Sequence, residues 1–220
     1  MRLTHKKLKQ LILETMNEAL LTEEAKGIKD LPDYAYVHVF ARGRHEDLIT
    51  VMFTDKDGNM LPPVDIRTGE DKPIWGDVSF FKQDPNGRPC DGAAVIAITN
   101  VADGWGPFLY DIAMEIATMH FNGLTSDRNV VSYPDAQDVW YFYNQYRAKP
   151  ISGDVKAYQL DDEYNSLTPK KSDNCGQSQA RERSQDYGGV WSDKDNPLSK
   201  RYTKPPVILN QLKDKLIWDL

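Results

Sequence analysis

Two glycines, Gly104 and Gly106, stand one residue apart between an apolar run and a stretch with helical spacing. The apolar run is Gly92–Thr99 (GAAVIAIT), and its unbroken hydrophobicity is typical of a central strand covered on both faces. Pro107 suits the first turn of a helix, where its missing N–H costs nothing. A glycine turn at a helix N-terminus exposes backbone N–H groups beside the positive end of the helix dipole. We therefore predict an anion site within residues 103–108.

The spacing excludes two common nucleotide-binding motifs. In a dinucleotide fingerprint the third glycine would fall at Leu109, and no lysine followed by serine or threonine completes a P-loop. The strands expected before this turn also follow one another without intervening helices, which argues against a doubly wound parallel sheet.

The elements that must position this turn can be predicted from periodicity. Apolar residues recur at helical spacing over residues 3–25, and alternating or apolar runs predict strands. The expected strands before the glycine turn are Tyr34–Arg42, Asp47–Thr54, Gly76–Gln83 and the run at Gly92–Thr99. One helix is expected from Pro107 to about residue 120, and a second from Asp135 to Tyr146 with Ser132 as a candidate cap.

This order of elements resembles the GCN5-related N-acetyltransferase (GNAT) family. In that family, consecutive strands lead into a loop of pattern [QR]-x-x-G-x-[GA], and a helix, a short strand and a further helix follow. Here residues 101–106 (VADGWG) match the loop, residues 107–120 its helix, Gly123-Leu124 the next segment and Asp135–Tyr146 the last helix. The stretches GWGPFLYDIAMEIA, GLTSDR and PLSKRYTKP look especially similar to GNAT-like proteins encoded by bacteriophages.

The resemblance implies an α/β fold with a mixed, mainly antiparallel sheet and helices on both faces. It implies acetyl-CoA as cofactor and an amine, on a protein or a small molecule, as acyl acceptor. The coenzyme pyrophosphate would bind the loop and the start of its helix. The residues expected to bind the cofactor are Val101, Asp103, Gly104, Trp105, Gly106, Pro107 and Phe108.

Acyl transfer to an amine needs a base and a proton donor for the leaving sulfur. His38, in an expected strand, is the candidate base, and Tyr143, in the last expected helix, is the candidate donor. The sequence departs from the family pattern at Val101, where Gln or Arg is usual, and at Trp140, where a tyrosine is usual. Whether the chain is an enzyme therefore stays open, and the alternative is a catalytically silent GNAT-like fold that serves as a phage structural or interaction protein.

Domain organisation follows from composition. Residues 1–160 are expected to form the GNAT-like domain, with its core in residues 34–147. Between residues 161 and 195 the only aliphatic side chains beyond alanine are Leu167 and Val190, too few to offset the entropy of ordering. We therefore expect residues 161–220 to form a polar, irregular extension that ends in a short helix.

The net charge of −6 argues against direct nucleic-acid binding, which needs a basic face. No apolar stretch is long enough for a membrane span, and the cysteines and histidines show no metal-ligand spacing, so neither a membrane nor a metal is expected. The expected location is the cytoplasm, that of the host cell if the chain is phage-encoded, with the virion as the other option. In that reducing setting Cys90 and Cys175 are expected to be free thiols.

Overall fold

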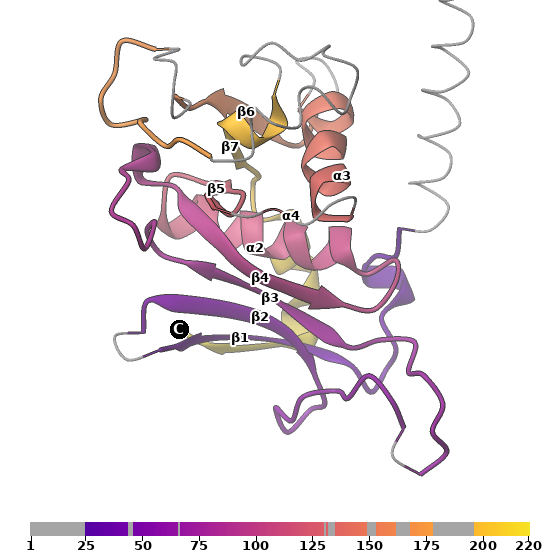
Figure 1. Ribbon diagram of the computed structural model, residues 1–220. Helices are drawn as coiled ribbons and strands as arrows, with labels where there is room; N and C mark the ends of the chain where they lie inside the picture. The colour runs from indigo at the N-terminus through magenta and orange to yellow at the C-terminus, as the bar shows by residue number, and fades with distance from the viewer. Residues whose placement is uncertain are drawn as a thin grey trace, which may run out of the picture.

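The computed structural model describes residues 25–43, 46–65, 67–129, 131, 135–148, 153–161, 168–177 and 196–220. Its centre is a twisted eight-stranded sheet of order β6-β7-β5-β4-β3-β2-β1-β8 (Figure 1). Antiparallel pairs predominate, and only β4–β5 and β1–β8 are parallel. The expected α/β class and the mixed, mainly antiparallel sheet are confirmed. The helix expected over residues 3–25 lies almost wholly outside the described residues.

The first half of the sheet is an antiparallel meander. Its strands are β1 (Tyr36–Arg42), β2 (Leu48–Thr54), β3 (Gly76–Phe81) and β4 (Ala94–Val101), all at the expected places. The polar segment that follows β2 folds as a tight turn. In this turn the Asp55 carboxylate accepts hydrogen bonds from the backbone N–H groups of Asp57 and Asn59. Asp55 therefore serves the turn, as its sequence context predicts.

Helix α2 (Gly106–His120) crosses from β4 to β5 (Leu124–Thr125) and contributes more buried side chains to the core than any other described element. Figure 1 shows α2 and α4 (Val207–Leu212) on the same side of strands β1–β4. Alternate residues of the meander face them, for example Val37, Val51 and Phe80, and all three are fully buried. Helix α3 (Asp135–Phe142) follows β5 and continues into a π-helical turn at Tyr143–Arg147. The described helices do not test the expectation of helices on both faces, which remains a prediction.

The C-terminal region differs from the extension that its composition predicts. Strands β6 (Lys156–Gln159) and β7 (Lys200–Thr203) continue the sheet beyond β5, and β8 (Leu216–Asp219) pairs with β1 at the opposite edge. Only α4 matches the expected short helix. The strands escape prediction because β6 and β7 carry little apolar signal, while the apolar residues of β8 also fit helical spacing with those of α4.

Buried charges tie this region to α2. The Lys204 ammonium, 2% exposed, pairs with the fully buried Glu115 carboxylate and lies 3.7 Å from that of Asp111. Glu115 also accepts the backbone N–H groups of Ile208 and Leu209 at 2.9 and 2.8 Å, which satisfies the first turn of α4. One carboxylate of α2 therefore fixes both the end of β7 and the start of α4.

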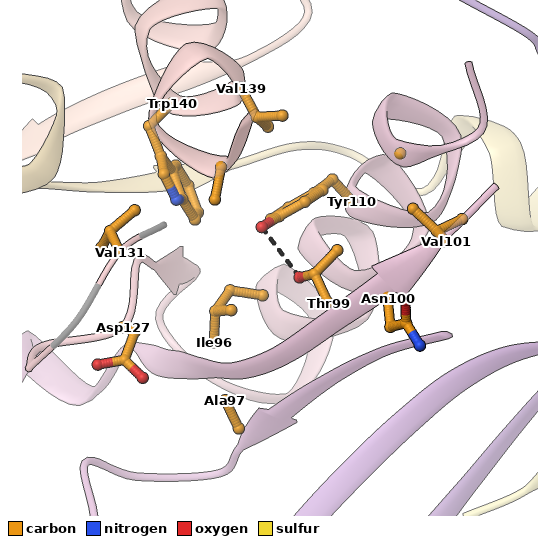
Figure 2. Close-up of a pocket in the computed structure, with 12 residues that line it drawn as sticks. Ile96, Ala97, Thr99, Asn100, Val101, Tyr110, Asp127, Val131, Val139 and Trp140 are labelled. Atoms are coloured by element: carbon orange, nitrogen blue, oxygen red, sulfur yellow. Dashed lines mark hydrogen bonds between the residues drawn. The ribbon is translucent and has the colours of Figure 1, made fainter. Parts of the chain in front are cut away.

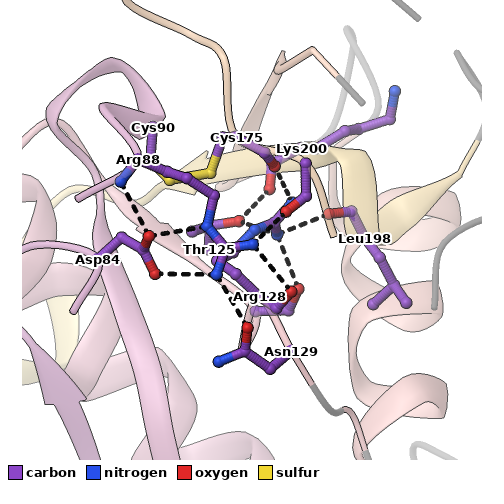
Figure 3. The surroundings of a disulfide bond; sticks show 11 residues. Asp84, Arg88, Cys90, Thr125, Arg128, Asn129, Cys175, Leu198 and Lys200 are labelled. Carbon is purple, nitrogen blue, oxygen red and sulfur yellow. Dashed lines mark hydrogen bonds and ion pairs between the residues drawn. A yellow bond between two sulfur atoms is a disulfide. The ribbon is translucent and has the colours of Figure 1, made fainter. Parts of the chain in front are cut away.

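Cys90 and Cys175 are joined by a disulfide (Figure 3), so the expectation of two free thiols is wrong for this structure. Both cysteines are fully buried and pack with Val95 and Leu160. Residues 168–177 carry few apolar groups but dock through backbone carbonyls, and that of Gly176 accepts from Arg88 at 2.8 Å. The segment is ordered in spite of its polar composition, because hydrogen bonds and a covalent link hold it without a large apolar surface.

The disulfide should contribute strongly to stability, since it spans a sequence separation of 85 residues. The chain-entropy model gives about 4 to 5 kcal/mol for a loop of this length. We expect the free energy of unfolding in urea to fall by at least about 2 kcal/mol in the Cys90→Ser/Cys175→Ser variant. Thiol alkylation of the unreduced, denatured wild type should label neither cysteine, and labelling of both would contradict the bond.

Glu115→Gln should destabilise the fold by about 2 to 4 kcal/mol, because it breaks a buried ion pair while Asp111 still partly compensates Lys204. The exposed Asp214→Asn is the matched control and should leave the urea midpoint unchanged. Equal midpoints for the two variants would show that the pair does not anchor the C-terminal region.

Candidate functional site

A pocket of about 350 Å³ opens where β4 continues past the end of β5 (Figure 2). β4 pairs with β5 only at Ala94 and Val95, whereas its pairing with β3 continues to Val101. Ile98 is 52% exposed and does not line this pocket, although the apolar run predicts a strand covered on both faces along its whole length. The pocket is lined by Ile96, Ala97, Thr99, Asn100, Val101, Gly106, Tyr110, Asp127, Val131, Ala136, Val139 and Trp140.

A bulge marks the part of β4 that lines the pocket. The register with β3 passes from Phe80↔Ile96 to Ser79↔Ile98, so Ala97 has no partner residue across that pair. A bulge bends its strand and leaves the extra residue out of the ladder. Since β5 has already ended, the backbone of β4 from Ala97 onward presents its other edge to the pocket.

Helix α3 supplies the facing wall. Trp140 is 1% exposed and packs edge-on against Tyr110 of α2, with ring centroids 5.6 Å apart, and against Tyr202 of β7 at 5.3 Å. Val139 of α3 and Val131, which precedes the helix and is buried, complete this wall (Figure 2). The pocket is therefore a groove with apolar sides and a strand edge as its floor.

Few polar side chains enter this groove. The Thr99 hydroxyl donates to the Tyr110 hydroxyl at 3.0 Å. Burial raises the pKa of Tyr110 to about 12, so this hydroxyl keeps its proton at neutral pH. Asn100 and Asp127 supply the remaining polar side chains of the lining.

The glycine loop meets the pocket at one end. Gly104 has φ 80°, a left-handed conformation that favours glycine, and the Trp105 N–H turns back to the Ala102 carbonyl at 3.1 Å. Gly106 has no positive φ, and a Cβ there would meet only Val101 at 3.7 Å. Its N–H lies in the first turn of α2, where the helix itself offers no acceptor. Gly106 is thus not needed by the fold, and its open side faces the pocket.

Of the seven residues expected to bind a cofactor, some line the pocket and others do not. Val101 and Gly106 line the pocket, whereas Trp105 and Phe108 are core residues that pack against Phe53. The others of the set, which do not line the pocket, are Asp103, Gly104 and Pro107.

The two candidate catalytic residues lie away from the pocket. His38 lies on β1, three strands from β4, and its Nε2 is 2.7 Å from the Asp219 carboxylate of β8. Tyr143 is fully buried and donates to the Asp111 carboxylate at 2.6 Å. Burial and that carboxylate raise the pKa of Tyr143 well above its usual value. The geometry therefore brings neither residue to the groove.

Arg128 has a structural position rather than a ligand-facing one. Its guanidinium, 1% exposed, donates to the Thr125 hydroxyl at 2.9 Å, to the Leu198 carbonyl at 2.8 Å and to the Cys175 carbonyl (Figure 3). These bonds join the end of β5 to the disulfide-linked segment and to the residues before β7. The turn that carries Asp127 into the pocket is held by this arginine.

Sequence reasoning missed Thr99, Tyr110 and Asp127 as pocket residues. Trp140 and Val139 were expected on the apolar stripe of a helix, but such a stripe is far more often core than pocket wall. The 14-residue segment between α2 and α3 does not by its length predict that β5 has only two residues.

Within the described residues, no group of three or more histidine, cysteine or acidic side chains could hold a metal ion. None of the described helices is long and apolar enough to cross a membrane. Comparison with protein-family models, curated proteins and solved structures finds no match for this chain.

The two loop glycines should respond differently to alanine. Gly106→Ala should leave the melting temperature unchanged or slightly higher, because the site has room and alanine favours a helix. Gly104→Ala should cost about 1 kcal/mol or more, since a Cβ disfavours positive φ. Differential scanning calorimetry of both variants tests this. A large loss in Gly106→Ala would mean that this glycine serves the fold.

Proposed function

We propose that the groove between β4 and α3 binds the acyl-CoA thioester of an N-acyltransferase reaction, with acetyl-CoA as donor and an amine as acceptor. The observation that carries the proposal is the coincidence of three features: the early end of β4–β5 pairing, the bulge at Ala97 and the first turn of α2 at Gly106. Each feature alone is common. Together they form an elongated pocket with hydrogen-bonding groups along one side and a helix N-terminus at one end.

The chemistry of coenzyme A fits this arrangement. Its pantetheine arm is narrow and carries amide groups, which can pair with an open strand edge as an added strand does. Residues 97–101 of β4 offer such an edge. The diphosphate at the other end of the arm would lie at the Gly106 end, where N–H groups that have no acceptor within the helix and the helix dipole favour negative charge.

The sequence resemblance adds to this support. Four consecutive antiparallel strands, a glycine loop, α2, the short β5 and α3 follow in the order expected of a GNAT-like chain. The closing strands β6 and β7, which the sequence does not reveal, complete the same sheet. We accordingly propose GNAT-like identity for the fold, and a phage origin on the strength of the sequence stretches alone.

A second function is favoured by one observation. Because His38 and Tyr143 lie outside the groove, neither the expected base nor the expected proton donor reaches a bound thioester. Tyr110 is the one tyrosine among the described lining residues, and its protonated hydroxyl is the remaining candidate donor to the leaving sulfur. If no donor acts, the chain is a catalytically silent GNAT-like protein that binds coenzyme or a structural partner.

Titration with acetyl-CoA, followed by calorimetry, tests the binding site. The wild type should bind, and Gly106→Val should bind about tenfold more weakly or worse, because its side chain fills the phosphate end and removes a charge-assisted contact. Gly27→Ala is the matched control: it has no neighbour within 4 Å and no positive φ, and it lies outside the pocket.

Turnover with an amine panel then separates the two functions. Tyr110→Phe should abolish any activity while leaving acetyl-CoA affinity unchanged, whereas Tyr143→Phe should affect stability first, through Asp111. Binding without turnover would select the silent protein. Absence of binding by the folded wild type at millimolar acetyl-CoA would contradict both the proposed coenzyme site and the proposed acyltransferase activity.

A further inference from the structure

Asp127 is the one carboxylate among the described residues that line the pocket. It follows β5 by two residues, and its Oδ1 accepts the backbone N–H of Asn129 at 2.6 Å. This turn fixes the side chain of Asp127, while the neighbouring Arg128 donates hydrogen bonds to the carbonyl groups of Leu198 and Cys175. A charged group is thus held at the wall of a groove whose other sides are mostly apolar.

The position of Asp127 gives the groove two chemically different ends. In Figure 2 Asp127 and Val131 lie on one side of the pocket, while Asn100 and Val101 lie on the other. Val101 is also the nearest neighbour of a Cβ built at Gly106. The helix N-terminus, which favours anions, and the carboxylate, which favours cations, are therefore separated by the length of the groove.

We propose that Asp127 is a specificity-determining residue that binds the acceptor amine as its ammonium ion, which must release one proton to solvent before its nitrogen attacks the thioester. The inference rests on the proposed coenzyme site: with phosphates at the Gly106 end, the thioester end points toward Asp127. An alkylammonium group can form a charge-assisted hydrogen bond to this carboxylate. The apolar wall of Val131, Val139 and Trp140 would contact the hydrocarbon part of the same molecule. The substrate class is thus a primary amine on an aliphatic or cyclic hydrocarbon.

Two amines of similar shape distinguish the effect of charge on binding from the effect of shape. Cyclohexylamine is a cation at neutral pH and aniline is not. Binding of each to the coenzyme A-saturated protein, measured by calorimetry, needs no turnover. Wild type should bind cyclohexylammonium, and Asp127→Asn should weaken this by about tenfold or more, the usual effect of losing a charged hydrogen-bond partner. Aniline affinity and coenzyme A affinity should be the same in both proteins.

The variant is suited to this test because asparagine can accept the same Asn129 N–H, so the turn and the melting temperature should be preserved. Asp138→Asn is the matched control. It removes an equal charge from an exposed position on α3, and Asp138 does not line the pocket. If turnover exists, Asp127→Asn should raise KM for cyclohexylamine by a larger factor than KM for aniline.

The outcomes distinguish the two proposals. Equal cyclohexylammonium affinity in wild type and Asp127→Asn, with coenzyme A still bound, overturns the role of Asp127 and leaves the coenzyme site intact. A loss of affinity of the same size in Asp138→Asn also overturns it, because the effect would then come from the general field of the protein. Absence of coenzyme A binding by wild type overturns the proposed function and this inference with it.

Discussion

The parallel pairing of β4 with β5 ends after two residues, and the candidate pocket depends on that limit. A longer β5 would extend the ladder along Ile96 and beyond, and the groove would be filled by a strand. Instead the chain turns away at Ser126, where the buried Arg128 binds the carbonyl groups of Cys175 and Leu198. The pocket therefore exists because an arginine diverts the chain toward segments far along the sequence.

Other interactions hold the two segments whose carbonyl groups accept hydrogen bonds from Arg128. The disulfide fixes Cys175 beside the start of β4, and the Glu115–Lys204 pair fixes the end of β7 to α2. Gly123 allows β7 to approach closely, since a Cβ there would lie 2.5 Å from the Tyr202 carbonyl. A disulfide fits poorly with a reducing cytoplasm. The expected cytoplasmic location and the virion alternative both remain proposals, and this bond is the first feature that bears on them.

Much of the first half of the fold can be predicted from the sequence. Alternation and turn chemistry place β1 to β3, and the glycine turn places α2, because these signals are local. The C-terminal strands could not be predicted in the same way. β7 is the polar stretch Lys200–Thr203, and it becomes a strand only because β5 and β6 lie on either side of it. The groove is harder to predict than the strands, because Thr99, Tyr110 and Trp140 lie on three different elements. Each of them, taken alone, fits the pattern of a core residue.

We propose that the open edge of β4 and the first turn of α2 form one binding surface. Hydrogen exchange of the backbone amides, measured with and without coenzyme A, tests this most directly. We expect slowed exchange to be concentrated in residues 97–101 and in Gly106 and Phe108, with β1 and β2 unchanged. Unchanged exchange in residues 97–108 at saturating coenzyme A, or protection confined to another part of the chain, would contradict it.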